Sequence, residues 1–162
     1  DVVTSILEDN NNNLWVGTWG GGLNKIKFST SIQNYSISKI EIYKHNSEKR
    51  QSISSDIVQD IYEDSKGNLW IGTEDGLNLF NTKQSDFFHY KHNSNDSKSI
   101  SDNRIQSSCI IEDKLGYLWV GTWNGLNRLK LSDNSTDLHK NNFKHFYKET
   151  NRSFYELLKG NV

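Results

Sequence analysis

The chain has 162 residues, with no Ala, Pro or Met, 20 Asn, 20 Ser and a formal net charge of −1. Because Ala and Met favour helices whereas Asn and Ser compete with helical hydrogen bonds, this composition argues against an α-rich fold. The small net charge gives no general attraction for nucleic acid or for an anionic membrane, and no apolar run is long enough to span a bilayer. We therefore expect no nucleic-acid partner and no direct membrane contact by this segment.

One motif recurs three times along the chain. Each copy contains Glu-Asp, then Leu-Trp-(Val or Ile)-Gly-Thr, then Gly-Leu-Asn, and the Trp always follows the Asp by six residues. The copies start at equivalent polar positions, so we predict repeats over about 1–55, 56–102 and 103–160 and the start of a fourth at 161–162. Fixed internal spacing over this many positions indicates a repeat architecture.

Each copy predicts four short strands in the same order. The first strand alternates β-branched and polar residues, as in Val58–Glu63, and a turn separates it from the Leu-Trp strand. The Gly-Leu-Asn block begins the third strand, and an aromatic segment such as Phe87–Tyr90 forms the fourth. Four antiparallel strands in about 50 residues make one propeller blade. We therefore predict an all-β fold of three four-stranded antiparallel β-propeller blades. Two extra residues around Ser107–Ser108 predict either a bulge in the first strand of the third copy or a displaced start of that strand.

The repeated blocks resemble a known family. The second copy reads Glu-Asp-x-x-Gly-Asn-Leu-Trp-Ile-Gly-Thr-x-x-Gly-Leu-Asn, and His-Asn and Ser-Ile-Ser precede the next copy. This pattern resembles the two-component regulator propeller repeat, which builds the sensor region of bacterial hybrid two-component histidine kinases. The resemblance implies a periplasmic or extracellular segment of a membrane-anchored protein that senses a carbohydrate and is not itself an enzyme.

We expect the recurring tryptophans and glycines to have structural roles. A large ring fills the wedge between neighbouring blades, so we expect Trp15, Trp70 and Trp119 to lie in the core. We expect the glycines of Gly-Thr and Gly-Leu to lie at tight turns.

The loop between the second and third strands differs among the copies, and we expect any ligand to bind at this loop. It contains Trp19 in the first copy, Glu74 and Asp75 in the second, and Trp123 and Asn124 in the third. The two indoles could stack on a sugar ring while the polar side chains bind its hydroxyls. Alternatively, these indoles pack against the neighbouring blade.

Other site chemistries find little support in the sequence. The segment Asp9–Asn13 lacks the Gly and Glu of a calcium loop, the single Cys109 excludes a cysteine-based zinc site, and no nucleophile motif is present. We therefore expect no metal, no cofactor and no catalytic residues. Two further functions stay open, a protein-interaction scaffold without a small ligand and an enzyme that resembles the streptogramin-lyase propellers.

Three blades are fewer than a closed propeller needs. Propellers close with four to eight blades, so an isolated set of three leaves two blade faces uncovered. We therefore expect the partners of this segment to be further propeller blades or a second copy of itself, in addition to an oligosaccharide ligand.

Overall fold

The computed structural model describes residues 1–31, 34–132, 140 and 142–146, and all regular elements in that part of the chain are β-strands. The first blade comprises β1 (Val2–Glu8), β2 (Leu14–Trp19), β3 (Leu23–Ser31) and β4 (Asn34–Tyr43). The second blade comprises β5 (Val58–Glu63), β6 (Leu69–Thr73), β7 (Gly76–Asn81) and β8 (Asp86–Tyr90). The third blade comprises β9 (Ile105–Glu112), β10 (Tyr117–Thr122), β11 (Gly125–Lys130) and β12 (Lys144–Phe146).

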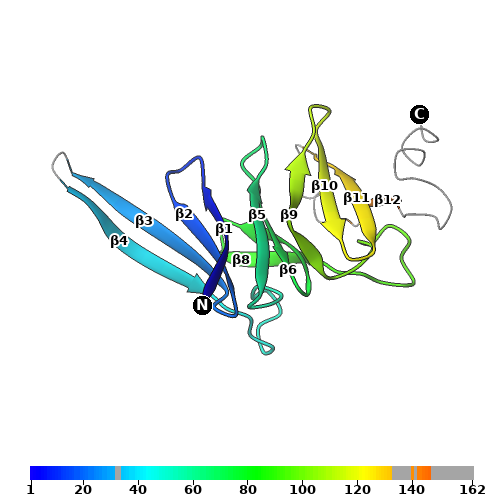
Figure 1. The fold of residues 1–162 in the computed structure, drawn as a ribbon, viewed down its shortest axis with the longest axis horizontal. Coiled ribbons are helices and arrows are strands. Elements are labelled where there is room, and N and C mark those ends of the chain that lie inside the picture. Colours follow the sequence, from blue (N-terminus) through cyan, green and yellow to red (C-terminus); the bar gives the residue numbers. More distant parts are fainter. Residues whose placement is uncertain (32–33, 133–139, 141, 147–162) are drawn as a thin grey trace.

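The strands of each blade pair in chain order to form a four-stranded antiparallel sheet. The three sheets stand side by side, with the first strands β1, β5 and β9 adjacent to one another (Figure 1). The prediction of an all-β fold built from four-stranded antiparallel blades is confirmed. The expected start of a fourth repeat at 161–162 lies outside the described residues. In the described part of the chain there is no helix with the length and apolarity that crossing a membrane requires.

An aspartate closes the turn between the first two strands of every blade. In the second blade, Asp64 Oδ1 accepts the backbone N–H groups of Lys66 at 3.0 Å and Asn68 at 2.9 Å, and its Oδ2 accepts Trp70 Nε1 at 2.9 Å. The carboxylate thus fixes the turn and the indole together, which explains the constant six-residue spacing from Asp to Trp. The other blades repeat the indole bond, from Trp15 to Asp9 at 2.8 Å and from Trp119 to Asp113 at 2.6 Å.

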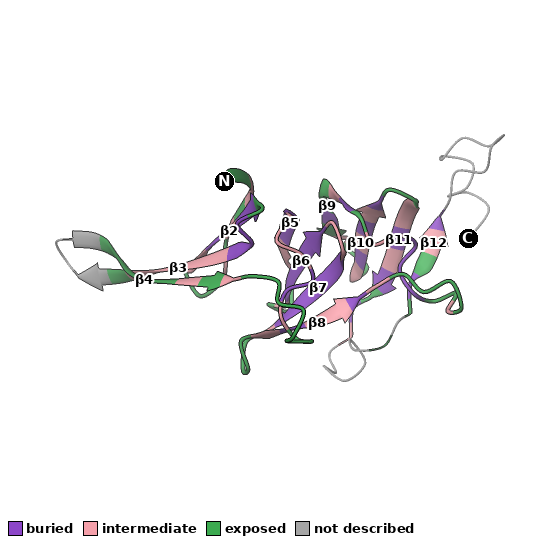
Figure 2. Ribbon diagram, turned by 90° about the horizontal axis from the view of Figure 1, so that it is seen from below, coloured by how far each residue is buried: buried purple, intermediate pink, exposed green. Residues whose placement is uncertain are grey.

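Two apolar cores lie between successive blades. Trp15 packs its edge against Phe80 of the second blade, with ring centroids 5.0 Å apart, and Trp70 lies in the corresponding core between the second and third blades. The second blade is covered on both faces and its β6 and β7 are almost wholly buried (purple in Figure 2). The first core contains Trp15, Leu23, Ile53, Val58, Ile61, Leu69, Ile71, Phe80 and Phe87.

Trp119 differs from the other two core tryptophans. Trp15 and Trp70 are buried, whereas Trp119 is only half-buried. Its ring contacts Phe146 of its own blade, with centroids 5.3 Å apart. The physical reason for the difference is that no further blade lies against this face in the described part of the chain.

The glycine of each Gly-Thr pair serves close packing rather than a turn. Gly72 lies inside β6, where a Cβ atom would come 2.6 Å from Ile105 Cγ2 of the third blade, and Gly17 inside β2 has the same relation to Val58. The expectation of tight turns is therefore wrong for these glycines. The expectation of a tight turn is correct for Gly76, whose φ of 123° is accessible to glycine and disfavoured for other residues.

In the second and third blades, a glutamate links the blade to the one before it. Glu63 Oε2 accepts the backbone N–H of Asn10 at 2.9 Å, and Glu112 accepts both the N–H and the hydroxyl of Ser65, at 2.6 and 2.7 Å. In the repeated Glu-Asp pair, the aspartate therefore binds its own blade and the glutamate binds the turn of the preceding blade.

We expect removal of a fully buried indole to destabilise the fold strongly. Trp70→Ala creates a cavity between two blades and should lower the free energy of unfolding by about 3–5 kcal/mol, whereas Trp123→Ala at an exposed position should change it by about 0.5 kcal/mol or less. Urea unfolding followed by circular dichroism measures both values. Equal losses in the two variants would contradict the core assignment.

The indole bonds should also make stability depend on pH. Partial burial alone would raise the pKa of Asp9, but hydrogen bonds from Trp15 and Asn13 lower it below its ordinary value, and Asp113 is lowered in the same way by its bond from Trp119. A lowered folded-state pKa stabilises the fold above about pH 4, and this contribution is lost as the pH falls through the folded-state value. The urea midpoint should fall on acidification, and less steeply in an Asp9→Asn/Asp113→Asn variant. The same slope in both proteins would argue against this origin.

Candidate functional site

The loops that carry the candidate ligand residues lie along one edge of the three blades. We call this edge the loop rim and define it by 19–22, 74–76 and 123–125. The loop of each of the first two blades is tied to the start of the next blade, since Gly22 N–H donates to the Asp56 carbonyl at 3.0 Å and Gly76 N–H donates to the Asn103 carbonyl at 2.7 Å. The rim is therefore continuous from blade to blade rather than a set of independent loops.

Both rim tryptophans are open to solvent. Trp19 exposes 53% of its surface and Trp123 exposes 63%. Arg104, next to the first residue of β9, stacks on Trp123 with its guanidinium carbon 4.8 Å from the ring centroid. Asp102 holds this guanidinium through two bonds, to Nε at 3.1 Å and to Nη2 at 2.9 Å. The Trp123 ring is thus positioned by a fixed cation on one side.

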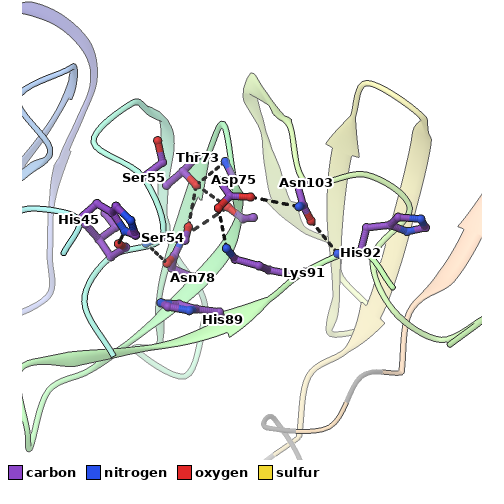
Figure 3. Close-up of polar contacts among 12 residues, drawn as sticks. His45, Ser54, Ser55, Thr73, Asp75, Asn78, His89, Lys91, His92 and Asn103 are labelled. Atoms are coloured by element: carbon purple, nitrogen blue, oxygen red, sulfur yellow. Dashed lines mark hydrogen bonds and ion pairs between the residues drawn. The ribbon is translucent and has the colours of Figure 1, made fainter. Parts of the chain in front are cut away.

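The two adjacent carboxylates of the second loop have different partners. Asp75 accepts Lys91 Nζ at 2.6 Å and Asn103 Nδ2 at 3.1 Å, and so ties its own blade to the start of the third (Figure 3). Glu74 instead accepts Gln59 Nε2 at 2.5 Å. Since the carboxylates are held separately, they do not form the facing pair that acid–base hydrolysis requires.

Asn124 is held mainly by its own loop and by the preceding linker. Its backbone N–H donates to Thr122 Oγ1 at 3.3 Å, and its side-chain Nδ2 donates to the Ser101 carbonyl at 3.4 Å. Asn124 is thus tethered by these bonds but remains exposed to solvent, like Trp123 beside it.

A buried polar network lies beneath the rim. The Ser54 and Thr73 hydroxyls are 2.9 Å apart, Ser54 N–H donates to Asn78 Oδ1 at 3.0 Å, and Asn78 Nδ2 donates back to Ser54 Oγ at 2.8 Å (Figure 3). Ser101, Thr122 and Asn127 form the equivalent network in the third blade. Satisfied buried networks are rigid, so these residues give the rim loops a fixed base. The motifs Ser-Ile-Ser, Gly-Thr and Gly-Leu-Asn are each recognisable in the sequence, but the hydrogen bonds that join them were not predicted from it.

Three histidine side chains form hydrogen bonds with backbone carbonyl groups of the linkers. His45 Nδ1 lies 2.9 Å from the Ile53 carbonyl, and His92 Nδ1 lies 2.9 Å from the Ile100 carbonyl. His89 on β8 lies 2.6 Å from the Ser52 carbonyl through Nε2 (Figure 3 shows all three side chains). Among the described residues, no group of three or more His, Cys, Asp or Glu side chains is placed to hold a metal ion.

The first strand of the second blade carries a buried carboxylate. Asp60 Oδ2 accepts the Ile110 N–H at 2.9 Å, and Oδ1 accepts the Ile61 N–H at 2.9 Å and contacts Ser5 Oγ at 3.5 Å. Asp60 therefore joins β1, β5 and β9 at their centre. Burial raises its pKa, against the opposing effect of these hydrogen bonds. No motif marked this residue in the sequence, because its counterparts are Ser5 and Cys109.

The described surface has a hollow of about 410 Å³ away from the rim, on the third blade. It is strongly cationic, and Arg128 lies over the Tyr117 ring at 4.3 Å. Its lining residues are Ser97, Lys98, Tyr117, Arg128, Lys130, Asn142, Phe143, Lys144 and His145. Arg128 also reaches Trp119, so this hollow belongs to the blade face that has no described neighbour.

Comparison with known proteins relates the repeats to signalling receptors. The family model for the two component regulator propeller matches residues 1–20, 52–75 and 99–124, one stretch in each blade. The extracellular domain of the putative hybrid two component system BT3049 from B. thetaiotaomicron superimposes with a TM-score of 0.70 at 27% identity, over 92% of this chain and 19% of that domain. The corresponding domain of BT4673 from the same organism has a TM-score of 0.62 at 23% identity, over 80% and 16% of the two chains, and supports the fold.

A curated histidine kinase is similar to a shorter stretch of the chain. Histidine kinase P4 of Formosa agariphila is 39% identical over 72 residues, which is 44% of this chain and 5% of the kinase. The chain thus spans a small part of every protein named here.

Proposed function

We propose that this chain, which contains three two component regulator propeller repeats, is part of the periplasmic or extracellular propeller of a two-component sensor and binds a carbohydrate at the loop rim. The sensor assignment is supported by the match of each blade to that repeat and by the similarity to an extracellular sensor domain. The ligand assignment rests on one observation, the exposure of Trp19 and Trp123 on the rim, where Asp102 holds Arg104 in a fixed position over the Trp123 ring.

The chemistry of the rim suits a sugar. An indole presents a flat apolar face that packs on the C–H face of a pyranose, and ordered polar groups at its edge bind hydroxyls. The rim offers Glu74 as an acceptor and Arg104 as a donor close to Trp123. An exposed aromatic residue on a rigid base also loses little conformational entropy when a ligand binds.

We propose a non-catalytic role for this segment. Asp75 is engaged in an ion pair with Lys91, and His45, His89 and His92 hold linker carbonyls. An enzyme of the lyase type would instead need a histidine and an acid that converge on one substrate site. Ligand binding then acts by stabilising one arrangement of the receptor over another, in proportion to its difference in affinity for the two.

Further blades are proposed to flank the three seen here, in line with repeats over about 1–55, 56–102 and 103–160. Val3, Ile6 and Ile40 of the first blade are 51, 63 and 53% exposed. Their counterparts by strand register in the second blade are fully covered by the first blade, and these are Val58, Ile61 and Phe87. The same surface in the first blade therefore suits another blade, from the same polypeptide or from a second copy.

A thermal-shift screen of the full-length sensor region against neutral and acidic oligosaccharides tests the proposal. We expect one glycan class to raise the melting temperature, and Trp19→Ala or Trp123→Ala to weaken its binding at least about tenfold, or ~1.4 kcal/mol. Leu115→Ala is the matched control, since Leu115 is an exposed apolar residue in the turn at the opposite end of the third blade. A protein that responds to no glycan would instead be a scaffold.

A further inference from the structure

The first strand of every blade shifts register at the same place, and the bulge in β9 is the longest of the three. Thr122 pairs with Ile105 and Val120 pairs with Ile110, so four residues lie between the paired positions of β9. In β5 the corresponding interval, from Val58 to Ile61, holds two. The two-residue insertion predicted from the sequence is confirmed as a bulge.

The inserted residues have an unusual backbone and an open position. Ser108 has a φ of 54°, in the left-handed region that is uncommon for a serine. Ser107 and Ser108 are both exposed. Bulges redirect side chains and are over-represented beside functional sites.

The bulge connects the third blade to the rim of the second. Ser107 Oγ donates to Gln59 Oε1 at 2.7 Å, and Gln59 Nε2 donates to Glu74 Oε1 at 2.5 Å. Gln59 is buried, so this relay from Ser107 fixes the Glu74 carboxylate from below. The first blade has Thr4 at the place of Gln59, and Thr4 bonds the Val58 carbonyl instead.

Arg104 stands at the same junction, since Gly76 of the second loop donates its N–H to the carbonyl of the adjacent Asn103 at 2.7 Å. Its position is fixed by Asp102 and by stacking on Trp123. The hydrogen bond to Asp102, with a smaller contribution from the nearby charge of Glu74, raises the pKa of the Arg104 guanidinium. A carboxylate from the second blade and a guanidinium from the third are thus electrostatic neighbours beside one exposed indole.

The charges at this junction are unequally matched. Arg104 is paired with Asp102 at 2.9 Å, and Asp75 is paired with Lys91 at 2.6 Å. Among the described residues, Glu74 has no cationic side chain within ion-pair distance and is held by a neutral amide. The uncompensated charge of the junction is therefore negative, which opposes an anionic ligand and favours groups that donate hydrogen bonds.

We propose that Ser107, Gln59, Glu74, Arg104 and Trp123 form one subsite at the junction of the second and third blades, and that it binds the hydroxyl edge of an uncharged sugar ring stacked on Trp123. This inference rests on the proposed carbohydrate function and makes it specific. Glu74 accepts from one hydroxyl, the free N–H groups of Arg104 donate to its neighbour, and the relay from the bulge holds the Glu74 carboxylate in place. Repulsion from Glu74 makes uronic acids bind more weakly than neutral sugars.

The test compares neutral gluco-, manno- and galacto-hexaoses with galacturonate hexamers on the full-length protein. Wild type should bind one of the neutral sugars at least about tenfold more tightly than the uronate. Deletion of Ser107 and Ser108 gives β9 the spacing of β5 and should reduce neutral-sugar binding at least tenfold while the ligand-free melting temperature is kept. Ser107→Ala keeps the chain length and should reduce binding in the same direction. The control is Ser94→Ala, an exposed serine of the preceding linker, which should have no effect.

Selectivity gives a second readout. Glu74→Gln removes the uncompensated charge while keeping a hydrogen-bonding group, so the preference for neutral sugar over uronate should fall at least fivefold. Equal binding of both classes by wild type, or neutral-sugar binding that survives both the deletion and Ser107→Ala, would overturn the subsite and leave the carbohydrate function standing. If wild type binds neither class, the carbohydrate function fails and the subsite fails with it.

Discussion

The hydrogen bond from each motif tryptophan to the aspartate six residues before it is the constraint on which the blade packing depends. Through it, one carboxylate closes a turn and orients the ring that fills the space between two blades. An indole in a core needs a partner for its N–H, and here the partner is supplied locally rather than by the neighbouring blade. Each blade can therefore present a correctly oriented ring before its neighbour is in place.

Hydrogen-bond partners are also supplied locally beneath the rim. Thr73 and Asn78 stand in motifs of the second blade, and Ser54 comes from the linker that leads into it. These buried groups satisfy one another, so the loop above them can vary in sequence without losing its anchor. Variation at Trp19, Glu74 and Trp123 is thus tolerated by the fold, and these are the positions at which ligand chemistry can differ between blades.

The sequence predicts the blades well because the determinants of a blade are local and repeat with fixed spacing. The strand order, the turn at Asp64 and the bulge in β9 follow from residues close together in the chain. The junctions between blades are harder to predict. Gln59 and Asp60 act on residues about 50 positions away, at sites where the three copies have different residues, so periodicity does not mark them. The exposure of Trp19 likewise depends on what a neighbouring loop leaves uncovered.

The glutamate that binds the turn of the preceding blade has a consequence for assembly. Glu63 and Glu112 act in one direction only, from a blade to the one before it, so blades associate head to tail through a heterologous interface. A heterologous interface does not by itself limit the number of blades, since each blade has a free face that can bind the next. Addition stops only when the rotation between blades closes a ring. Glu8 is the residue of the first blade that corresponds to Glu63 and Glu112, so the further blades proposed above would meet the first blade at Glu8 and the third blade at Trp119. The number of blades is then set by the angle between neighbours and not by any single contact within them.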